Sequence, residues 1–502
     1  MVTHMSEEVT KKDKELLNVP SEERLTGIQV SRIVEDYDQS QYLKNEAYYQ
    51  GKNLSLITQG IVNEQNGKNP NNVVPLPFAR KTINDLQGYA YKPGNVNYVF
   101  DEEDEEGEEV ELVRGVFKEN EEPLVSAEIF QDAAIKGEGA ELLYFANEKI
   151  QFTQIDREQC IFEYEDTVKE DKLKWSIRYY KFRETQRDGQ DEIIHRADVY
   201  YKERVDFYKW REKEELSGIN QQRDQARFDG DLSREYEYIG SELHPFGEVP
   251  LYPYRINSDR LGVFQPQIPI IDKLDELGSD SIANAIDQFN DTILLLSKSI
   301  QESDVDKIRE WKVLDDLGGK EEGNFAEFLQ RNLNIEATLE STKVFERWYY
   351  ELTGIPNLND EKFNVKSGIA IAYALTNFEN LVTSMEIYFT KSLKYRLMLI
   401  NNALIFFGFL SEGVEAELKW IRNLPFDLRE KTEVAAILKK EGLLSDETIL
   451  KLFPQSLVAN PQEEIQKRNK EKIRNLKDNQ SAMDALINEP RLSEDEDEEE
   501  EA

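Results

Sequence analysis

The stretch of residues 366–410 constrains the fold of this chain more than any other. It contains no proline, and its only glycines are Gly368 and Gly408. Apolar side chains recur there at the 3.6-residue period of a helix, at Ile371, Leu375, Phe378, Leu381, Val382, Met385, Phe389, Leu393 and Leu397. At 1.5 Å per residue such a helix is roughly 60 Å long. The pattern predicts a central helix that crosses a whole assembly or kinks partway.

The C-terminal half of this helix carries three cations, Lys391, Lys394 and Arg396. Cations suit the negative end of a helix dipole, and we expect them to form a basic island in a chain of net charge -38. The most apolar run, residues 397–410, contains Asn401 and Asn402. It has only about 14 residues, whereas a membrane span needs about 20, so no contact with a membrane is predicted.

Acidity is a property of the whole chain and not only of its tail. Removing the eight acids of residues 493–501 changes the net charge from -38 to -30. A protein that reads DNA sequence usually has a basic face, so we do not expect tight binding to phosphates. An acidic wall can still guide DNA, because it repels a moving polymer and keeps it from sticking.

The sequence contains no recognisable catalytic or metal-binding motif. One cysteine, Cys160, excludes a disulfide framework within one chain, and three histidines provide no zinc spacing. Residues 318–323, GGKEEG, have the glycines of a phosphate-binding loop but lack the lysine and the serine or threonine that should follow. We therefore predict no enzyme, no metal and no cofactor. The N-terminal residues are polar and carry no secretion signal, which favours an intracellular protein. The first four residues, MVTH, fit a segment added before a natural start at Met5.

The first half of the chain predicts helices followed by an antiparallel sheet. We expect one or two helices over residues 26–52, broken near residues 38–40, then a helix at 78–91, a strand at 95–100 and a helix at 122–136. The acid run 101–111 is interpreted as a solvated loop. Residues 141–208 alternate at period two and are rich in β-branched and aromatic residues, which predicts a sheet packed on the preceding helix.

Residues 267–289 predict an amphipathic helix with one acidic face. Asp272, Glu276, Asp280 and Asp287 fall within roughly 80° of one another at about 100° per residue. Ile271, Leu274, Leu277, Ile282 and Phe289 fall on the opposite side. Two interpretations remain open: an ordinary surface helix, or one wall of an acidic channel built from many copies.

A small insert at residues 290–335 separates that helix from a second one at about 335–352, which predicts a helical hairpin with a tip that serves as a docking surface. A loop at 353–367 then leads into the long helix. Short helices are expected at 412–423, 428–441, 446–453 and 461–486. The fold class predicted is α+β and mainly helical.

Three stretches, in this order, resemble the portal proteins of tailed bacteriophages, especially the siphophage type, and the resemblance covers roughly residues 25–490. They are KGEGAELLYFANEKIQFTQIDREQCIFEYED (136–166), TGIPNLNDEKFNVKSGIAIAYALTNFENLV (353–382) and EGLLSDETILKLFPQSLVANPQEEIQKR (441–468). The loop NLNDEKFNVKS departs from the family, which often has a glycine-rich stretch there.

The resemblance implies a division of the chain into the parts of a portal subunit. Its parts are a flexible arm (1–25), an α/β wing (26–265), stem helices (266–289 and 336–352), a small α/β clip (290–335), a tunnel loop (353–367), a tunnel helix (368–398), a helical crown (399–470), and a helical extension with an acidic tail (471–502).

The resemblance also implies a ring, usually of twelve subunits, at one capsid vertex of the virion, assembled in the host cytoplasm. Double-stranded DNA would pass through it during packaging and ejection, and terminase, head-completion, major capsid and scaffolding proteins would be its partners. The expected DNA-channel residues are Asn359, Asp360, Glu361, Lys362 and Lys366 on the loop, with Asp272, Glu276, Asp280 and Asp287 lining the stem. A non-viral α-rich scaffold or adaptor, or a DNA-processing enzyme, remains an alternative.

Overall fold

The computed structural model describes residues 24–55, 57, 74–92, 96–100, 107–166, 172–185, 191–211, 235–290, 293–296, 326–329, 335–357, 375–421 and 428–450, with shorter pieces between 453 and 474. The chain divides into two compact units. The first comprises Met1–Lys366 with Ala370–Asn423, and the second Ser367–Ile369 with Leu424–Ala502. The fold is mixed α+β with about half of it helical, which confirms the predicted class at that level.

The helices of the first unit confirm most of the predicted ones. They are α2 (Gly27–Asp36), α3 (Ser40–Tyr49), α5 (Phe78–Ala90), α6 (Glu108–Glu119), α7 (Glu122–Lys136), α8 (Ile268–Asn290), α10 (Ile335–Thr353) and α12 (Thr376–Phe406). The expected break near residues 38–40 separates α2 from α3. Thr26 caps α2, because its side chain accepts from the Gln29 backbone N–H while the Gln29 side chain accepts from the Thr26 N–H.

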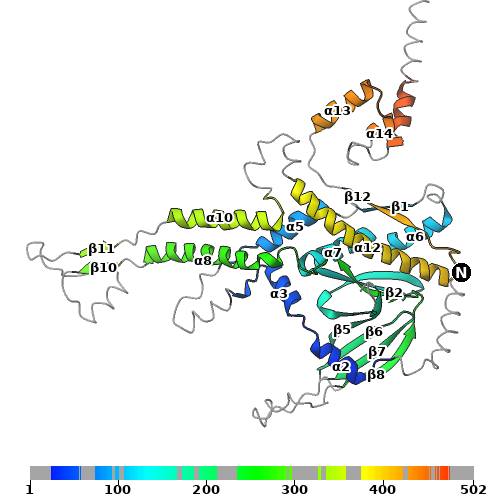
Figure 1. The fold of residues 1–502 in the computed structure, drawn as a ribbon, viewed down its shortest axis with the longest axis horizontal. Coiled ribbons are helices and arrows are strands. Elements are labelled where there is room, and N and C mark those ends of the chain that lie inside the picture. Colours follow the sequence, from blue (N-terminus) through cyan, green and yellow to red (C-terminus); the bar gives the residue numbers. More distant parts are fainter. Residues whose placement is uncertain are drawn as a thin grey trace, which may run out of the picture. The chain divides into compact units, whose positions relative to one another are not determined.

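Two antiparallel sheets form the body of this unit (Figure 1). The smaller has the order β3 (Lys149–Ile155), β2 (Glu138–Ala146), β9 (Leu251–Arg255). The larger has the order β4 (Cys160–Tyr164), β5 (Leu173–Thr185), β6 (Asp191–Tyr200), β7 (Arg204–Arg211), β8 (Glu237–Leu243). The antiparallel strands predicted for residues 141–208 are therefore confirmed, but they divide between two sheets and do not form the single sheet that was expected. Strand β9 pairs with β2 in the smaller sheet, from Glu138↔Arg255 to Leu142↔Leu251.

The main core lies where α7 and α12 meet the smaller sheet. Phe389 of α12 is fully buried, and its ring lies 4.9 Å from the Tyr254 ring and 5.4 Å from the rings of Tyr91 and Phe130, centroid to centroid. The described members of the predicted stripe on α12 are buried or half-buried. A second, smaller core forms between α2 and one face of the larger sheet, around Val30 and Ile177.

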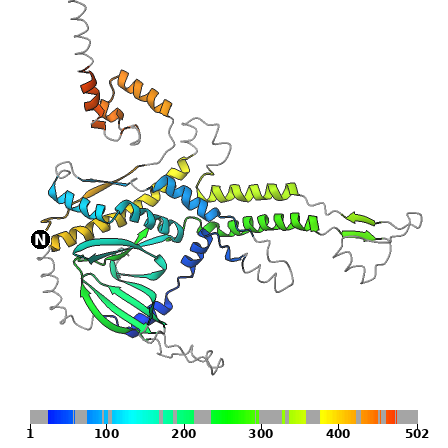
Figure 2. The same cartoon turned by 180° about the vertical axis from the view of Figure 1, so that it is seen from behind.

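A helical hairpin extends from this body, as the sequence predicted. Figures 1 and 2 show α8 and α10 side by side. Between them in the sequence, β10 (Ile293–Leu296) pairs antiparallel with β11 (Ala326–Leu329). The rest of the insert, between β10 and β11, lies outside the described residues.

Two local predictions were wrong. The acid run was expected to be a loop up to residue 111, but α6 begins at Glu108; the acids Glu108, Glu109 and Glu111 occupy its first turn, where the helix dipole favours negative charge. Residues 412–423 were expected to be helical, but β12 (Ala416–Trp420) pairs there with β1 (Val96–Phe100). A partner strand distant in the sequence therefore overrode local helix propensity.

The second unit contains α13 (Leu428–Lys440) and α14 (Asp446–Leu450). Gly442, with φ +67°, follows α13, and the Ser445 hydroxyl accepts from the Thr448 backbone N–H at 3.2 Å. The left-handed glycine ends α13, and the serine side chain caps the first turn of α14. Helical residues reappear at 461–462 and 464–472, where the last helix was predicted.

Candidate functional site

The base of the hairpin is fastened to the body through carboxylates of α8. Ile271 and Leu274 of α8 are buried, as expected for its apolar face. Asp275 is also buried, and it accepts from Asn53 Nδ2 and from the Leu76 backbone N–H, each at 2.7 Å. Burial raises the pKa of this carboxyl, while its hydrogen bonds act in the opposite direction. Asp275 was not among the acids of α8 expected to have a role.

The four acids expected on one face of α8 have different surroundings. Asp272 accepts a hydrogen bond from the Tyr48 hydroxyl of α3 at 2.6 Å, so its carboxylate faces the body. Glu276, one turn further out, is only partly exposed and pairs with Lys273 of the same helix at 2.5 Å. Asp280 and Asp287 lie further along α8, but their side chains are outside the described part of the structure. Of the two acids whose side chains are described, Asp272 is bonded to the body and Glu276 is bonded only within its own helix.

The loop between the hairpin and the long helix is described only at its start. Thr353 ends α10, and its hydroxyl donates to the Tyr350 carbonyl at 3.2 Å. Gly354 has φ +72°, and Ile355 is fully buried, so this first turn is anchored in the core. The expected DNA-channel residues Asn359, Asp360, Glu361, Lys362 and Lys366 lie outside the described residues.

The long helix that follows is bonded to the body along its length. Ser392 donates to the Pro253 carbonyl at 3.1 Å, Tyr395 to the Val249 carbonyl at 3.1 Å, and Asn402 to the Phe246 carbonyl at 2.9 Å. Asn401 donates to the Val414 carbonyl at 2.8 Å. Both asparagines of the apolar run are thus hydrogen-bonded, Asn401 from a buried position and Asn402 from a half-buried one. The helix ends at Phe406, beyond the boundary at residue 398 expected for the tunnel helix.

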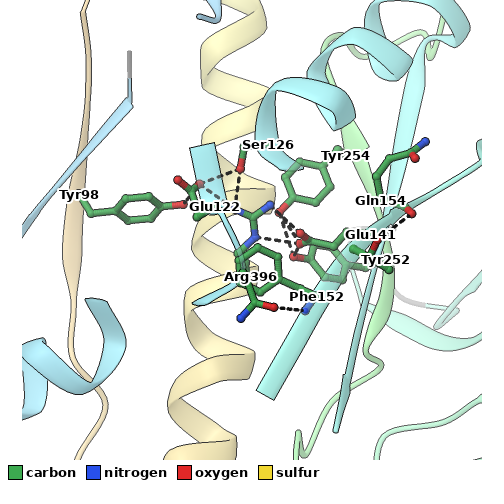
Figure 3. A network of polar contacts seen from close by, with 11 residues as sticks. Tyr98, Glu122, Ser126, Glu141, Phe152, Gln154, Tyr252, Tyr254 and Arg396 are labelled. Carbon is green, nitrogen blue, oxygen red and sulfur yellow. Dashed lines mark hydrogen bonds and ion pairs between the residues drawn. The ribbon is translucent and has the colours of Figure 1, made fainter. Parts of the chain in front are cut away.

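A buried polar network joins α12 to the rest of the body (Figure 3). Arg396 is fully buried and donates to both Glu141 oxygens, at 3.0 Å from Nε and 2.6 Å from Nη2. Its Nη1 donates to Glu122 Oε1 at 2.8 Å and to Ser126 Oγ at 2.7 Å. The guanidinium carbon lies 4.6 Å from the centre of the Phe152 ring. Strand β2 and helices α7 and α12 therefore meet at one guanidinium.

One arginine faces two carboxylates here, so hydroxyl donors have to offset the remaining negative charge. Tyr254 donates to Glu141 at 2.7 Å, Tyr252 also donates to Glu141, and Tyr98 donates to Glu122 at 3.1 Å. Burial raises the pKa of all three hydroxyls well above the usual range, and the neighbouring carboxylates raise it further. These tyrosines are therefore protonated donors at neutral pH.

The prediction that three cations form a basic island on this helix is wrong for one of them. Lys391 and Lys394 are exposed, but Arg396 is an interior residue that serves the core and not the surface. Its position carried a signal: Arg396 follows Phe389 by seven residues and Leu393 by three, which places it on the buried face. Its carboxylate partners are 255 and 274 residues away in the sequence, so no local pattern connects them.

Among the described residues, no group of three histidine, cysteine or acidic side chains is arranged to hold a metal ion. No helix within the described ranges is long and apolar enough to cross a membrane. The arrangement is that of a packed α/β body with a projecting helical hairpin.

Comparison with known proteins identifies a family for this chain. The family model described as "Phage portal protein, SPP1 Gp6-like" matches residues 32–478 of the 502. A comparison with curated proteins finds no match. The family match includes both sheets, the hairpin and the long helix, and much of the second unit. The chain therefore belongs to the bacteriophage portal proteins, a structural, non-enzymatic family of the capsid that takes part in DNA packaging and in head–tail connection.

Proposed function

We propose that this chain assembles into a ring of twelve copies at one capsid vertex and that double-stranded DNA passes through the ring during packaging and ejection. The chain acts as a conduit and a docking platform, without catalytic activity or cofactor of its own. It assembles in the host cytoplasm and becomes part of the virion. DNA passes without sequence-specific contacts.

The observation that carries this proposal is the order hairpin, loop, long helix on one α/β body. In this assignment residues 26–265 are the wing, 266–289 and 336–352 the stem, and 290–335 the clip. The anchored turn at Thr353–Asn357 begins the tunnel loop, and α12 contains the tunnel helix. Residues 399–470 form the crown, and 471–502 the helical extension with the acidic tail.

The lining of the channel is assigned to acids of the stem and to the loop. Asp272 lies at the base of the stem, where it also holds Tyr48, while Glu276, Asp280 and Asp287 continue the face outward. Repeated around a ring, such a face surrounds DNA with negative charge, and repulsion of the phosphates keeps the duplex mobile. On the loop, Asn359, Asp360, Glu361, Lys362 and Lys366 are the residues proposed to contact DNA.

Partners are assigned to the ends of the subunit. Terminase docks at the β10–β11 tip during packaging, and a head-completion or adaptor protein later occupies the same tip. Major capsid and scaffolding proteins bind the wing. A short two-stranded tip on two helices suits such docking, because it presents backbone and side chains away from the body.

Electron microscopy of the purified protein in negative stain tests the ring directly. We expect rotationally symmetric annuli with a central hole wide enough for a duplex. A chain that remains monomeric at all concentrations, by light scattering and by microscopy, contradicts the proposal.

Charge reversal on the stem tests the lining. The triple variant Glu276→Lys, Asp280→Lys, Asp287→Lys is expected to form rings that retain DNA and package it poorly, because introduced lysines attract phosphates. A matched control reverses three exposed acids of the body, namely Glu128, Glu148 and Glu163. Equal DNA packaging by the two variants would contradict the assignment of the stem acids to the channel lining.

A further inference from the structure

A cluster of three arginines surrounds one buried carboxylate at the start of β2. Glu138 is fully buried. Arg157 donates to its Oε2 from Nε at 3.1 Å and from Nη2 at 2.8 Å. Arg255 Nε lies 3.1 Å and Arg260 Nε 3.3 Å from its Oε1. Four N–H groups therefore converge on the two oxygens of Glu138, which occupies the acceptor capacity of this carboxylate.

The charges in this cluster do not balance. One carboxylate faces three guanidinium groups, which stay protonated at any ordinary pH. No second carboxylate of the described chain lies within ion-pairing distance of Arg255 or Arg260. Two positive charges thus remain uncompensated in a chain whose net charge is -38. Such an excess favours an added anion beside the two outer arginines.

The three arginines differ in how far their donors are used. Arg157 is buried and also donates from Nη1 to the Tyr37 hydroxyl and to the Cys160 carbonyl. The side chains of Arg255 and Arg260 are 26% and 39% exposed. Arg255 uses only Nε and Nη2, the latter on the Tyr164 hydroxyl at 2.7 Å. Within the described chain, Arg255 Nη1 and both Nη atoms of Arg260 have no hydrogen-bond partner.

The backbone around Arg260 is held in a costly conformation. Arg260 has φ +56°, a region that residues other than glycine rarely adopt. Its carbonyl lies against Gly137, where an added Cβ would be 2.2 Å from that oxygen. Asn257 brackets the loop by bonding the Leu261 carbonyl at 2.7 Å and the Leu261 N–H at 3.1 Å. The outer arginines are therefore preorganised before any ligand arrives.

Both outer guanidinium groups also lie beside one aromatic ring. The guanidinium carbons of Arg255 and Arg260 are each 5.3 Å from the centre of the Tyr164 ring. The ring attracts both cations and holds them near each other, with their free N–H groups available. A pair of guanidinium forks so arranged fits the two oxygens of a carboxylate.

We propose that Arg255 and Arg260 bind a carboxylate side chain of an adjacent copy of this chain and so form an electrostatic contact between subunits. This inference rests on the proposed ring. A neighbouring copy is the favoured source of the anion, because each copy carries 100 acidic against 62 basic residues. A DNA phosphate is disfavoured, because the same net charge repels DNA from the subunit.

Cross-linking identifies the bound carboxylate. In Arg260→Lys, a carbodiimide joins the introduced amine to a carboxylate in contact with it. We expect rings mixed from unlabelled and nitrogen-15-labelled protein to contain peptides in which position 260 of one isotope is joined to an acid of the other. Cross-links confined to one chain, or none at all, would overturn the proposal.

Assembly provides a second measurement. The variant Arg255→Gln, Arg260→Gln keeps Arg157 on Glu138 and should leave the circular dichroism spectrum unchanged. Its rings should dissociate at a protein concentration at least about tenfold higher than wild type, with a weaker dependence on salt. The matched control, Arg32→Gln with Arg211→Gln, removes two exposed charges elsewhere and should assemble like wild type.

The possible failures are distinguishable. If the wild-type protein forms no rings, the proposed function fails before this contact is tested. If wild-type and variant rings have the same stability and salt response, only the contact between subunits is wrong. If the variant assembles normally but loses DNA packaging, the anion is a phosphate, which also overturns the proposal.

Discussion

Removal of the buried guanidinium of Arg396 should destabilise the body strongly. Arg396→Met keeps most of the apolar length of the side chain but deletes four hydrogen bonds, two to Glu141, one to Glu122 and one to Ser126. Two buried carboxylates then lose their only guanidinium partner within the described network. Breaking one buried ion pair costs about 3–5 kcal/mol. The tyrosine hydroxyls that still donate to the carboxylates limit the loss, so we expect about 4 kcal/mol.

The assay is thermal unfolding followed by tryptophan fluorescence and circular dichroism. In a unit of roughly 400 residues, an unfolding entropy of about 2.1 cal/mol/K per residue means that each kcal/mol lowers the midpoint by about 1 °C. The expected decrease is therefore on the order of 4–5 °C. Lys394→Met is the matched control, because Lys394 lies two residues earlier on the same helix and is exposed. It should change the stability by no more than about 0.5 kcal/mol.

A second variant shows whether the loss is electrostatic. Adding Glu141→Gln to Arg396→Met removes one of the two stranded charges, while the amide still accepts from Tyr254. The double variant should therefore unfold at a higher temperature than Arg396→Met alone, which is non-additive behaviour expected of contacting groups. Equal midpoints for Arg396→Met and Lys394→Met, or a double variant less stable than the single one, would refute the role assigned to this network.

Three further predictions concern pH, a glycine and the loop. Burial lowers the pKa of His244 from 6.5 to about 4. The neutral imidazole therefore costs the folded state nothing above pH 6.5, and the free energy of unfolding decreases as the pH falls from 6.5 toward 4. In His244→Phe this acid-induced decrease, on the order of 3 kcal/mol, should be absent. The free energies of unfolding of the variant and the wild type, measured between pH 7 and 4.5, test this. If both change with pH in the same way, the assignment is wrong. Gly137→Ala should lower the free energy of unfolding by more than about 2 kcal/mol, because the added Cβ would collide with the Arg260 carbonyl. Gly51→Ala is the control: it also has positive φ, but no atom lies near its added Cβ, so it should cost about 1 kcal/mol. Equal losses in urea unfolding would contradict the steric explanation. Deletion of residues 357–363 should block DNA packaging while rings still assemble, as judged by nuclease-protected DNA and microscopy; normal filling would remove the loop from the mechanism.

The sequence by itself determined the local elements of this protein. The 3.6-residue stripe predicted α12, and the polar break near residues 38–40 separated α2 from α3. The alternation after Glu141 predicted the sheets, and the small insert predicted the hairpin of α8 and α10. These features depend on neighbours a few residues apart, so that periodicity, caps and turns are enough to define them. The family resemblance likewise depended on the order and spacing of such local segments.

Only the tertiary structure decided which polar groups are interior and what they contact. An arginine near the end of a helix fits a surface position or a buried ion pair equally well, and Arg396 became interior because Glu122 and Glu141 converge on it from distant parts of the chain. In the same way, Asp275 on α8 is buried because Asn53 and the Leu76 N–H supply its hydrogen bonds, whereas Glu276 beside it is partly exposed. The desolvation cost of a charge is offset only by partners that the fold brings together, and those partners leave no periodic trace in the sequence.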